Sequence, residues 1–261
     1  MTLVVRGLTV RFGGRTAVDG VSFTVPDGGR LGIIGGSGSG KSLTTLAILG
    51  LLPEGATATG SVLLDGVELL GMRERELARI RGLRVGVVFQ DPQTALNPLR
   101  TVGRQLAEPL RLHGLATRRQ QRAEAVRLAA LVRLPDPEQL VDLYPHQLSG
   151  GQRQRVAIGI ALACAPGLLL ADEPTTALDV TTQAAILALF DGLVEDTGAS
   201  LVFVTHDLAV LARISTDVLV LSEGRAIESG PVERILGAPQ QPVTAALVAA
   251  ARATSFRADE S

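Results

Sequence analysis

The sequence predicts an α/β fold built around a parallel β-sheet, and three features predict it. A glycine-rich loop joins a short apolar strand, Leu31–Ile34, to an apolar segment that can begin a helix, Leu43–Leu49. Two more continuous apolar runs, Leu168–Ala171 and Leu201–Val204, are typical of parallel strands buried on both faces. Between them, apolar residues at 186–194 recur at helical spacing. We therefore expect strands and helices to alternate around one sheet.

Composition fits a globular chain of this kind. The 261 residues can form one large domain or a domain with an inserted subdomain, and 46% of them are hydrophobic. Because 25 basic and 26 acidic residues leave a net charge of −1, bulk attraction to nucleic acid is not expected. Aromatic residues make up 3% and Trp is absent, which disfavours base-stacking platforms. A lone cysteine, Cys164, excludes an internal disulfide.

No signal peptide or membrane span is expected. Met1–Val5 lacks a long apolar core before Arg6. The uncharged segment Val156–Ala171 is shorter than the roughly 20 residues of a span, and Pro166-Gly167 interrupts it. We interpret it as a helix end followed by a buried strand, and expect a soluble chain that reaches any membrane through a partner.

The N-terminal quarter predicts strands and tight turns. Apolar runs on either side of Gly7 predict two strands, and Val21–Val25 alternates with period two. Residues 53–60 are expected to be loop. Asp65-Gly66 then predicts a hairpin between two short strands, 61–64 and 67–69. Further turns are expected at Gly13-Gly14 and Pro26–Gly29, a charged helix at 73–81 and an apolar strand at Val85–Phe89.

A helical insertion is expected at about 91–154. Residues 101–134 are rich in Ala, Leu, Arg, Gln and Glu, with Val102, Leu106 and Leu110 at helical spacing. Pro135–Pro137 ends this segment. Four arginines on it fit a docking face or, more simply, a solvated helix surface: Arg118, Arg119, Arg122 and Arg127.

The C-terminal part predicts a closing hairpin and a tail. Val218–Leu221 and Arg225–Glu228 flank a turn at Glu223-Gly224. Residues 241–261 are Ala-rich and then polar, so we expect a short helix with a frayed end.

The glycine-rich loop matches the phosphate-cradling pattern G-x-x-x-x-G-K-[ST]. Its residues are Gly35, Gly36, Ser37, Gly38, Ser39, Gly40, Lys41 and Ser42. Glycines let backbone N–H groups turn toward one anion, and the following helix points its positive end there. Lys41 is expected to reach the terminal phosphates and Ser42 to hold Mg²⁺. A ligand-free turn is the alternative, and the flanking strand and helix favour the phosphate site.

Carboxylates end one of the buried strands. Asp172 and Glu173 directly follow Leu168–Ala171, at the edge where parallel sheets bind ligands. Asp172 would support Mg²⁺, and Glu173 would polarise an attacking water. An acidic helix cap before Pro174 is the alternative. His206 follows Leu201–Thr205 at the same type of edge, where a functional histidine competes with a satisfied core histidine.

A third motif lies at Leu148–Gln152. Ser149 and Gln152 fit an S-x-x-Q capping box that begins the helix containing Arg153–Ala163. Gly150 and Gly151 leave free N–H groups at that helix end, which could hold an anion. The structural and functional interpretations are compatible.

Together these motifs resemble the nucleotide-binding subunits of ATP-binding-cassette (ABC) transporters. The resemblance rests on the P-loop, Gln90, Leu148–Gln152, Asp172-Glu173, Ala177–Asp179 and His206, in this order. It implies a P-loop NTPase with a parallel-sheet core, an antiparallel β subdomain and an inserted α-helical subdomain. Residues 1–240 would form the ATPase domain and 241–261 a short tail.

The resemblance also implies roles for individual residues. Two subunits would close head to tail, with ATP and Mg²⁺ between the P-loop of one and Ser149, Gly150, Gly151 and Gln152 of the other. Gln90 would sense Mg²⁺ and the attacking water, Asp179 would lie across the interface, and His206 would hold the γ-phosphate near Glu173. Phe12 would stack on adenine, where the alternative is a core residue.

Finer similarity points to the peptide/nickel importer group. It rests on Phe89–Pro98, Ala107–Leu110, Tyr144–Leu148 and Asp172–Val180. The similarity implies ATP hydrolysis coupled to uptake of peptides or nickel, on the cytoplasmic face of the inner membrane. Implied partners are a second ATPase subunit, identical or paralogous, two integral-membrane permeases and an extracytoplasmic solute-binding protein.

The solute stays open at this stage. Gly35–Thr44 and the short tail are similar to the nickel-importer ATPase, whereas Gln241–Thr244 departs from the His-Pro-Tyr-Thr usual in the group. A soluble ATPase of translation or DNA repair is the alternative function, although such proteins typically have two cassettes or a coiled-coil insertion. A regulator without hydrolysis conflicts with Glu173 and His206.

Overall fold

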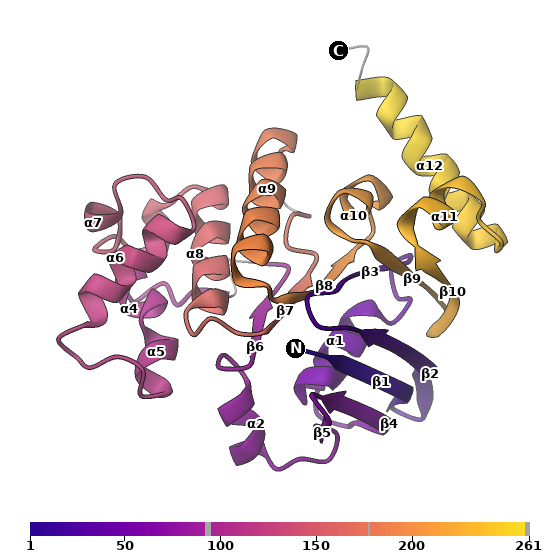
Figure 1. Cartoon of the computed structure of the whole chain (residues 1–261), viewed down its shortest axis with the longest axis horizontal. Coiled ribbons are helices and arrows are strands. Elements are labelled where there is room, and N and C mark those ends of the chain that lie inside the picture. Colours follow the sequence, from indigo (N-terminus) through magenta and orange to yellow (C-terminus); the bar gives the residue numbers. More distant parts are fainter. Residues whose placement is uncertain (92–94, 177, 259–261) are drawn as a thin grey trace. The chain divides into compact units, whose positions relative to one another are not determined.

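The computed structural model describes residues 1–91, 95–176 and 178–258, with side chains described up to residue 252. The chain forms two compact units. The first comprises Met1–Leu77 and Ser200–Ser261, and the second comprises Ala78–Ala199. Each unit is a mixture of helices and strands (Figure 1).

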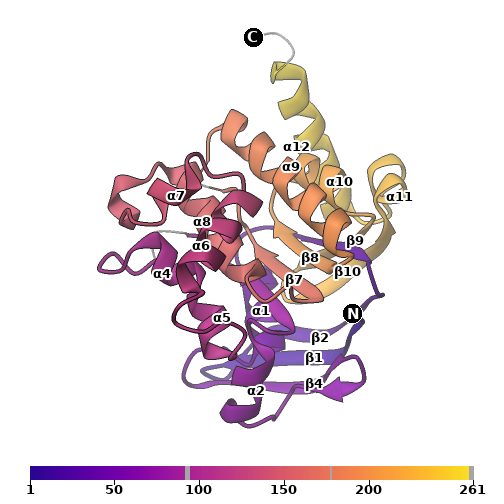
Figure 2. The same ribbon diagram turned by 60° about the vertical axis from the view of Figure 1, so that its left-hand side comes forward.

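An antiparallel sheet occupies the N-terminal part of the first unit. Its strands lie in the order β2-β1-β4-β5, and Figure 2 shows β2, β1 and β4 side by side. The bounds are β1 Leu3–Phe12, β2 Arg15–Val25, β4 Ala56–Leu64 and β5 Val67–Glu68. The predicted turn at Asp65-Gly66 is confirmed, with φ of 48° and 79° at its two residues.

Two sequence-based expectations about this sheet are wrong. Gly7 does not separate two strands but forms a bulge within β1, where the pairing with β2 shifts between Val5 and Leu8 and φ is 56°. Residues 56–60 are not loop but the start of β4. Thr57 and Ala58 pair with Arg11 and Val10 of β1, so a partner distant in sequence makes this stretch a strand.

A second sheet in the first unit carries the glycine-rich loop. β3 (Arg30–Ile34) lies between β8 (Ser200–Thr205) and β9 (Asp217–Ser222), and both pairings are parallel. β10 (Arg225–Pro231) pairs antiparallel with β9, which confirms the closing hairpin. The helices are α1 Lys41–Leu49, α10 Leu208–Ile214, α11 Val232–Gly237 and α12 Pro242–Ala258.

The buried side chains of this unit hold the tail in place. Ile34, Val220 and Leu211 pack in one apolar cluster with Ile235 and Val248, so the C-terminal helices share the core of β3 and β9. Burial of such side chains is the main stabilising contribution of a core.

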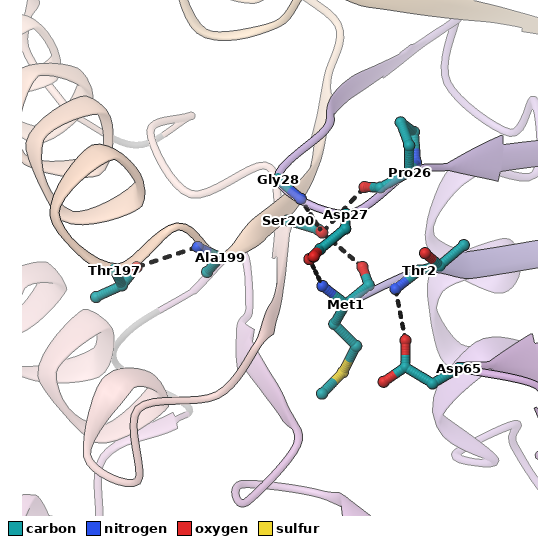
Figure 3. A network of polar contacts seen from close by, with 9 residues as sticks. All are labelled: Met1, Thr2, Pro26, Asp27, Gly28, Asp65, Thr197, Ala199 and Ser200. Atoms are coloured by element: carbon teal, nitrogen blue, oxygen red, sulfur yellow. Dashed lines mark hydrogen bonds and ion pairs between the residues drawn. The ribbon is translucent and has the colours of Figure 1, made fainter.

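A buried serine joins the start of the chain to β8 (Figure 3). The Ser200 hydroxyl accepts a hydrogen bond from Gly28 N at 3.0 Å, and Met1 O and Pro26 O lie 2.6 and 3.1 Å from it as acceptors. The Met1 ammonium also pairs with the Asp27 carboxylate. The 26–29 turn is thereby fixed on the strand that follows the second unit.

The second unit contains one parallel strand pair and most of the helices. β6 (Val85–Val88) pairs with β7 (Leu168–Asp172). Its helices are α4 Val102–Leu106, α5 Glu108–Leu112, α6 Gln121–Leu131, α7 Pro137–Leu140, the 3₁₀ turn Pro145–Gln147, α8 Gly150–Leu162 and α9 Val180–Thr197. The charged helix α2, Glu74–Ile80, precedes them.

Several expectations for this unit are confirmed. The apolar stripe Ile186, Leu189, Phe190, Leu193 and Val194 is the buried face of α9. The helical segment 101–134 is divided into three helices, with Ala107 between the first two and Gly114 in the left-handed region before the third. Among the described residues of both units, no helix is both long and apolar enough to cross a membrane.

Candidate functional site

The glycine-rich loop forms the centre of the candidate site in the first unit. It runs from β3 into α1, whose N-cap Gly40 has φ of 100°. Gly38 also has a positive φ, 75°, and an added Cβ at Gly35 would lie 2.2 Å from Leu221 O. Only glycine tolerates these positions without strain, so the loop conformation depends on them.

Two polar groups inside this loop fit a phosphate ligand. Lys41 is 6% exposed, and its ammonium donates to Gly35 O at 2.8 Å and Gly36 O at 3.1 Å. The Ser39 hydroxyl is buried and makes no hydrogen bond within the described residues. A buried hydroxyl without a partner costs free energy, and a phosphate oxygen would provide the missing acceptor.

Lys41 is also the single lysine of the chain. The other basic side chains are arginines and three histidines, so Lys41 carries the one side-chain amine of this sequence. A reagent selective for amines therefore reports on Lys41 alone among the side chains, although its burial will make the reaction slow.

A cavity of about 720 Å³ adjoins the loop. Phe12 at the end of β1 is 49% exposed, so the alternative of a core residue is wrong. Phe12, Gly38 and Leu43 line this cavity, and its volume suits a nucleoside. The remaining lining residues are Arg15, Thr16, Ala17, Pro53 and Glu223.

The β9–β10 turn is attached to the same loop. Gly224 N donates to Ser39 O at 3.1 Å, and Gly224 O accepts from Asp19 N at 2.8 Å. Arg225 adds an ion pair to Asp19 at 2.7 Å. Gly224 must be glycine, because an added Cβ would lie 2.6 Å from Ala17 O. His206 directly follows β8 and is exposed, which disfavours a core histidine.

The second unit brings together Gln90 and Glu173. The Gln90 amide nitrogen lies 3.5 Å from a Glu173 carboxylate oxygen, and the Thr176 hydroxyl donates to the same oxygen at 2.9 Å. Glu173 has φ of 47°, a strained conformation for a glutamate that is typical of functional sites. Asp172, 7% exposed, is the last residue of β7.

The serine–glycine motif begins α8 as predicted. Ser149 Oγ accepts from Gln152 N at 3.2 Å, and Gln152 Oε1 accepts from Ser149 N at 2.9 Å, a complete capping box. The N-terminus of α9 lies beside it, because an added Cβ at Gly151 would be 2.6 Å from Thr182 Cγ2.

Asp179 caps α9. Its carboxylate accepts from Thr182 Oγ1 at 2.7 Å and from Thr182 N at 2.9 Å. These hydrogen bonds from Thr182 hold the pKa of Asp179 below its ordinary value. Ala177, and Pro92–Thr94 of the predicted motif after Gln90, lie outside the described residues.

Sequence reasoning missed several residues of these sites. Arg15 and Glu223 line the cavity beside Phe12, but neither belongs to a recognisable motif. Thr176 and Thr182 orient Glu173 and Asp179. A helix-capping search could have found Thr182, three residues after Asp179.

Fold and loop together define a P-loop NTPase. Two solved structures of the ATP-binding cassette MJ0796, one a dimer in a post-hydrolysis state bound to ADP and phosphate, match with TM-scores of 0.77 and 0.78. Each is 32% identical, and each match covers 89% of this chain and 99% of the other.

The family is established by sequence as well. The ABC transporter family model matches residues 18–176, more than half of the chain, and the chain belongs to this family of ATPases. A probable peptide ABC transporter ATP-binding protein of Sinorhizobium fredii is 46% identical, over 95% of this chain and 76% of the relative.

Glutathione import ATP-binding proteins are similar to the same degree. That of Pectobacterium atrosepticum is 47% identical over 94% of this chain, and that of Escherichia coli K12 is 46% identical over 90%. The chain spans only 41% and 39% of the length of these two relatives.

Proposed function

We propose that this chain is the ATP-hydrolysing subunit of an importer for peptide-like solutes. The observation that carries the proposal is the glycine loop around Lys41 and the unpartnered Ser39 hydroxyl, beside the cavity of Phe12. Relatives named for peptide transport and glutathione import support a peptide-like solute over nickel. Proposed partners are a second ATPase subunit, two permeases and an extracytoplasmic binding protein, at the cytoplasmic face of the membrane.

Each predicted site residue has a proposed task. Phe12 stacks on adenine, and the loop Gly35–Ser42 binds the phosphates. Mg²⁺ when bound neutralises phosphate charge, and Ser42, Gln90 and Asp172 would hold it. Glu173 positions and polarises the attacking water, and His206 steadies the γ-phosphate. Ser149, Gly150, Gly151, Gln152 and Asp179 serve the interface with a second subunit.

Hydrolysis by Glu173 can be tested by substitution. Glu173→Gln keeps the size of the side chain but removes its capacity to accept a proton, so ATP binding should persist while phosphate release falls about a hundredfold or more. Glu195 on α9 is exposed, so Glu195→Gln is the matched control and should hydrolyse ATP normally. Turnover of Glu173→Gln at the wild-type rate, with partners present, would refute the role.

Nucleotide contact with the loop can be tested through its single lysine. An amine-reactive ester should modify Lys41 and the N-terminus alone, as read by peptide mass spectrometry. Bound ATP should protect Lys41, because its ammonium would then contact phosphate, and should leave the N-terminus reactive. Measurable modification of Lys41 at the same rate with and without saturating ATP would contradict the proposed site.

A further inference from the structure

The helical segment of the second unit contains a cavity lined mainly by arginines. It has a volume of about 370 Å³, and we name it the arginine pocket. Its lining residues are Arg100, Arg104, Glu108, Arg111, Arg118 and Gln121. A second cavity, of about 240 Å³, shares Arg104, Arg118 and Gln121 with it. None of these residues belongs to the sites described above.

Positive charge in the arginine pocket is not balanced. Glu108 is the only acidic residue among the described residues that line it, and this carboxylate pairs with both Arg100 and, at 3.6 Å, Arg111. Arg104 and Arg118 are exposed and make no ion pair or hydrogen bond within the described residues. Four guanidinium groups therefore face one carboxylate, in a chain whose net charge is −1.

The neighbouring cavity does not supply the missing negative charge. Asp142 lines that cavity, but its carboxylate already forms an ion pair with Arg122 at 2.5 Å. Gln121 adds a donor instead: its amide nitrogen is buried and makes no hydrogen bond within the described part of the chain. Two unpaired cations and one unpaired amide donor thus line the same pocket.

We propose that the arginine pocket binds a phosphate group with two or more negative charges. The planar guanidinium group of an arginine can form two parallel hydrogen bonds with two oxygens of one phosphate group. Arg104 and Arg118 would hold the phosphate from two sides, and Gln121 would donate a third hydrogen bond. A soluble phosphate compound and a phospholipid headgroup both carry this chemistry. The proposal does not depend on the importer function.

Binding of pyrophosphate tests the pocket directly. The titration uses the full chain carrying Lys41→Ala, which removes the phosphate contact in the glycine loop. Arg104→Gln and Arg118→Gln should each weaken the affinity about tenfold or more, since each removes a charge-assisted hydrogen bond. Arg119→Gln removes the same charge one residue away, outside both cavities, and should change the affinity less than twofold.

A spectroscopic measurement covers the case in which Lys41→Ala does not fold. Pyrophosphate added to the wild-type chain should shift the guanidinium NMR signals of Arg104 and Arg118 but not that of Arg119. Unchanged signals for both arginines, or equal losses of affinity in all three arginine variants, would overturn a phosphate site for soluble ligands.

Vesicles distinguish the source of the phosphate. Sedimentation with phosphatidylcholine vesicles containing phosphatidylglycerol, lost in Arg104→Gln and Arg118→Gln but kept in Arg119→Gln, would assign the pocket to a lipid headgroup. Pyrophosphate binding without vesicle binding would assign it to a soluble compound. If the chain bound neither pyrophosphate nor the vesicles through this pocket, the proposal would be wrong. The proposed ATPase function would not be affected.

Discussion

At the residue scale, two buried serines have opposite hydrogen-bonding states. The Ser200 hydroxyl has three polar partners, whereas the Ser39 hydroxyl has none within the described residues. Because an unmet hydrogen bond in a buried site is costly, the same substitution should have different effects at the two positions. The pair separates a structural hydroxyl from one that we expect to serve a ligand.

Ser200→Ala should lower the free energy of unfolding by about 1–3 kcal/mol, because it leaves the Gly28 N–H without an acceptor. Urea unfolding followed by circular dichroism measures this change. An unchanged midpoint would show that water replaces the hydroxyl at the 26–29 turn.

Ser39→Ala should leave the free energy of unfolding without ligand unchanged or slightly raised, since it removes a buried hydroxyl that has no partner within the described residues. It should weaken ATP binding, by roughly tenfold if one phosphate hydrogen bond is lost. Calorimetry with ATP measures the affinity. If Ser39→Ala destabilised the ligand-free chain as much as Ser200→Ala, the hydroxyl would have a structural role.

At the element scale, the start of α9 depends on an ionised cap. Hydrogen bonds from Thr182 hold the pKa of Asp179 below its ordinary value of 3.8. A carboxyl with a lowered folded-state pKa stabilises the fold above its unfolded-state pKa, and this contribution is lost as pH falls through the folded-state value.

We therefore expect the first turn of α9 to open only in acid, as pH falls below the ordinary carboxyl pKa and through the lowered pKa of Asp179. Hydrogen exchange at the Thr182 amide, corrected for the intrinsic pH dependence, should show protection falling in acid. Asp179→Asn removes the titrating group and should make this protection independent of pH over the same range. Equal acid sensitivity in wild type and Asp179→Asn would exclude Asp179 as the cause.

The elements that could be predicted from sequence are those whose signals are local. The capping box at Ser149 and Gln152, the turn at Asp65-Gly66 and the apolar stripe of α9 depend on residues within a few positions of one another. The β4 residues 56–60 and the bulge at Gly7 could not be predicted. The first depends on the pairing of β4 with β1 and the second on the pairing of β1 with β2, and both join residues more than ten positions apart.

At the scale of the whole molecule, the sequence motifs predicted the family and the glycine loop, but not the full lining of the cavity. Arg15 and Glu223 join Phe12 there only because the antiparallel sheet and the β9–β10 turn meet the loop in the fold. The arginine pocket has the same origin. Its residues extend from Arg100 to Gln121, and their common location depends on how short helices pack.

In the proposed importer, assembly of two ATPase chains is the step between ATP binding and transport. Gly150 begins α8, and an added Cβ there would meet nothing within 4 Å in the described structure. Gly150→Ala should therefore leave the isolated chain as stable as before, or slightly more stable, because alanine favours helix. In a dimer, Gly150 would contact the γ-phosphate that the second chain holds. The methyl group of Gly150→Ala would then obstruct this contact.

We expect Glu173→Gln to form dimers with ATP, because the uncleaved nucleotide would hold the two chains together, and to remain monomeric with ADP. Adding Gly150→Ala to Glu173→Gln should reduce the dimer fraction at least tenfold at equal ATP occupancy, measured by light scattering with size-exclusion chromatography. Ser39→Ala tests the glycine loop on the opposite side of the same phosphate. It should lower ATP occupancy, and the dimer fraction should fall as a consequence. Monomers of Glu173→Gln at saturating ATP would show that the partner ATPase is a different chain, and ATP-driven dimers unaffected by Gly150→Ala would exclude the α8 tip from the interface.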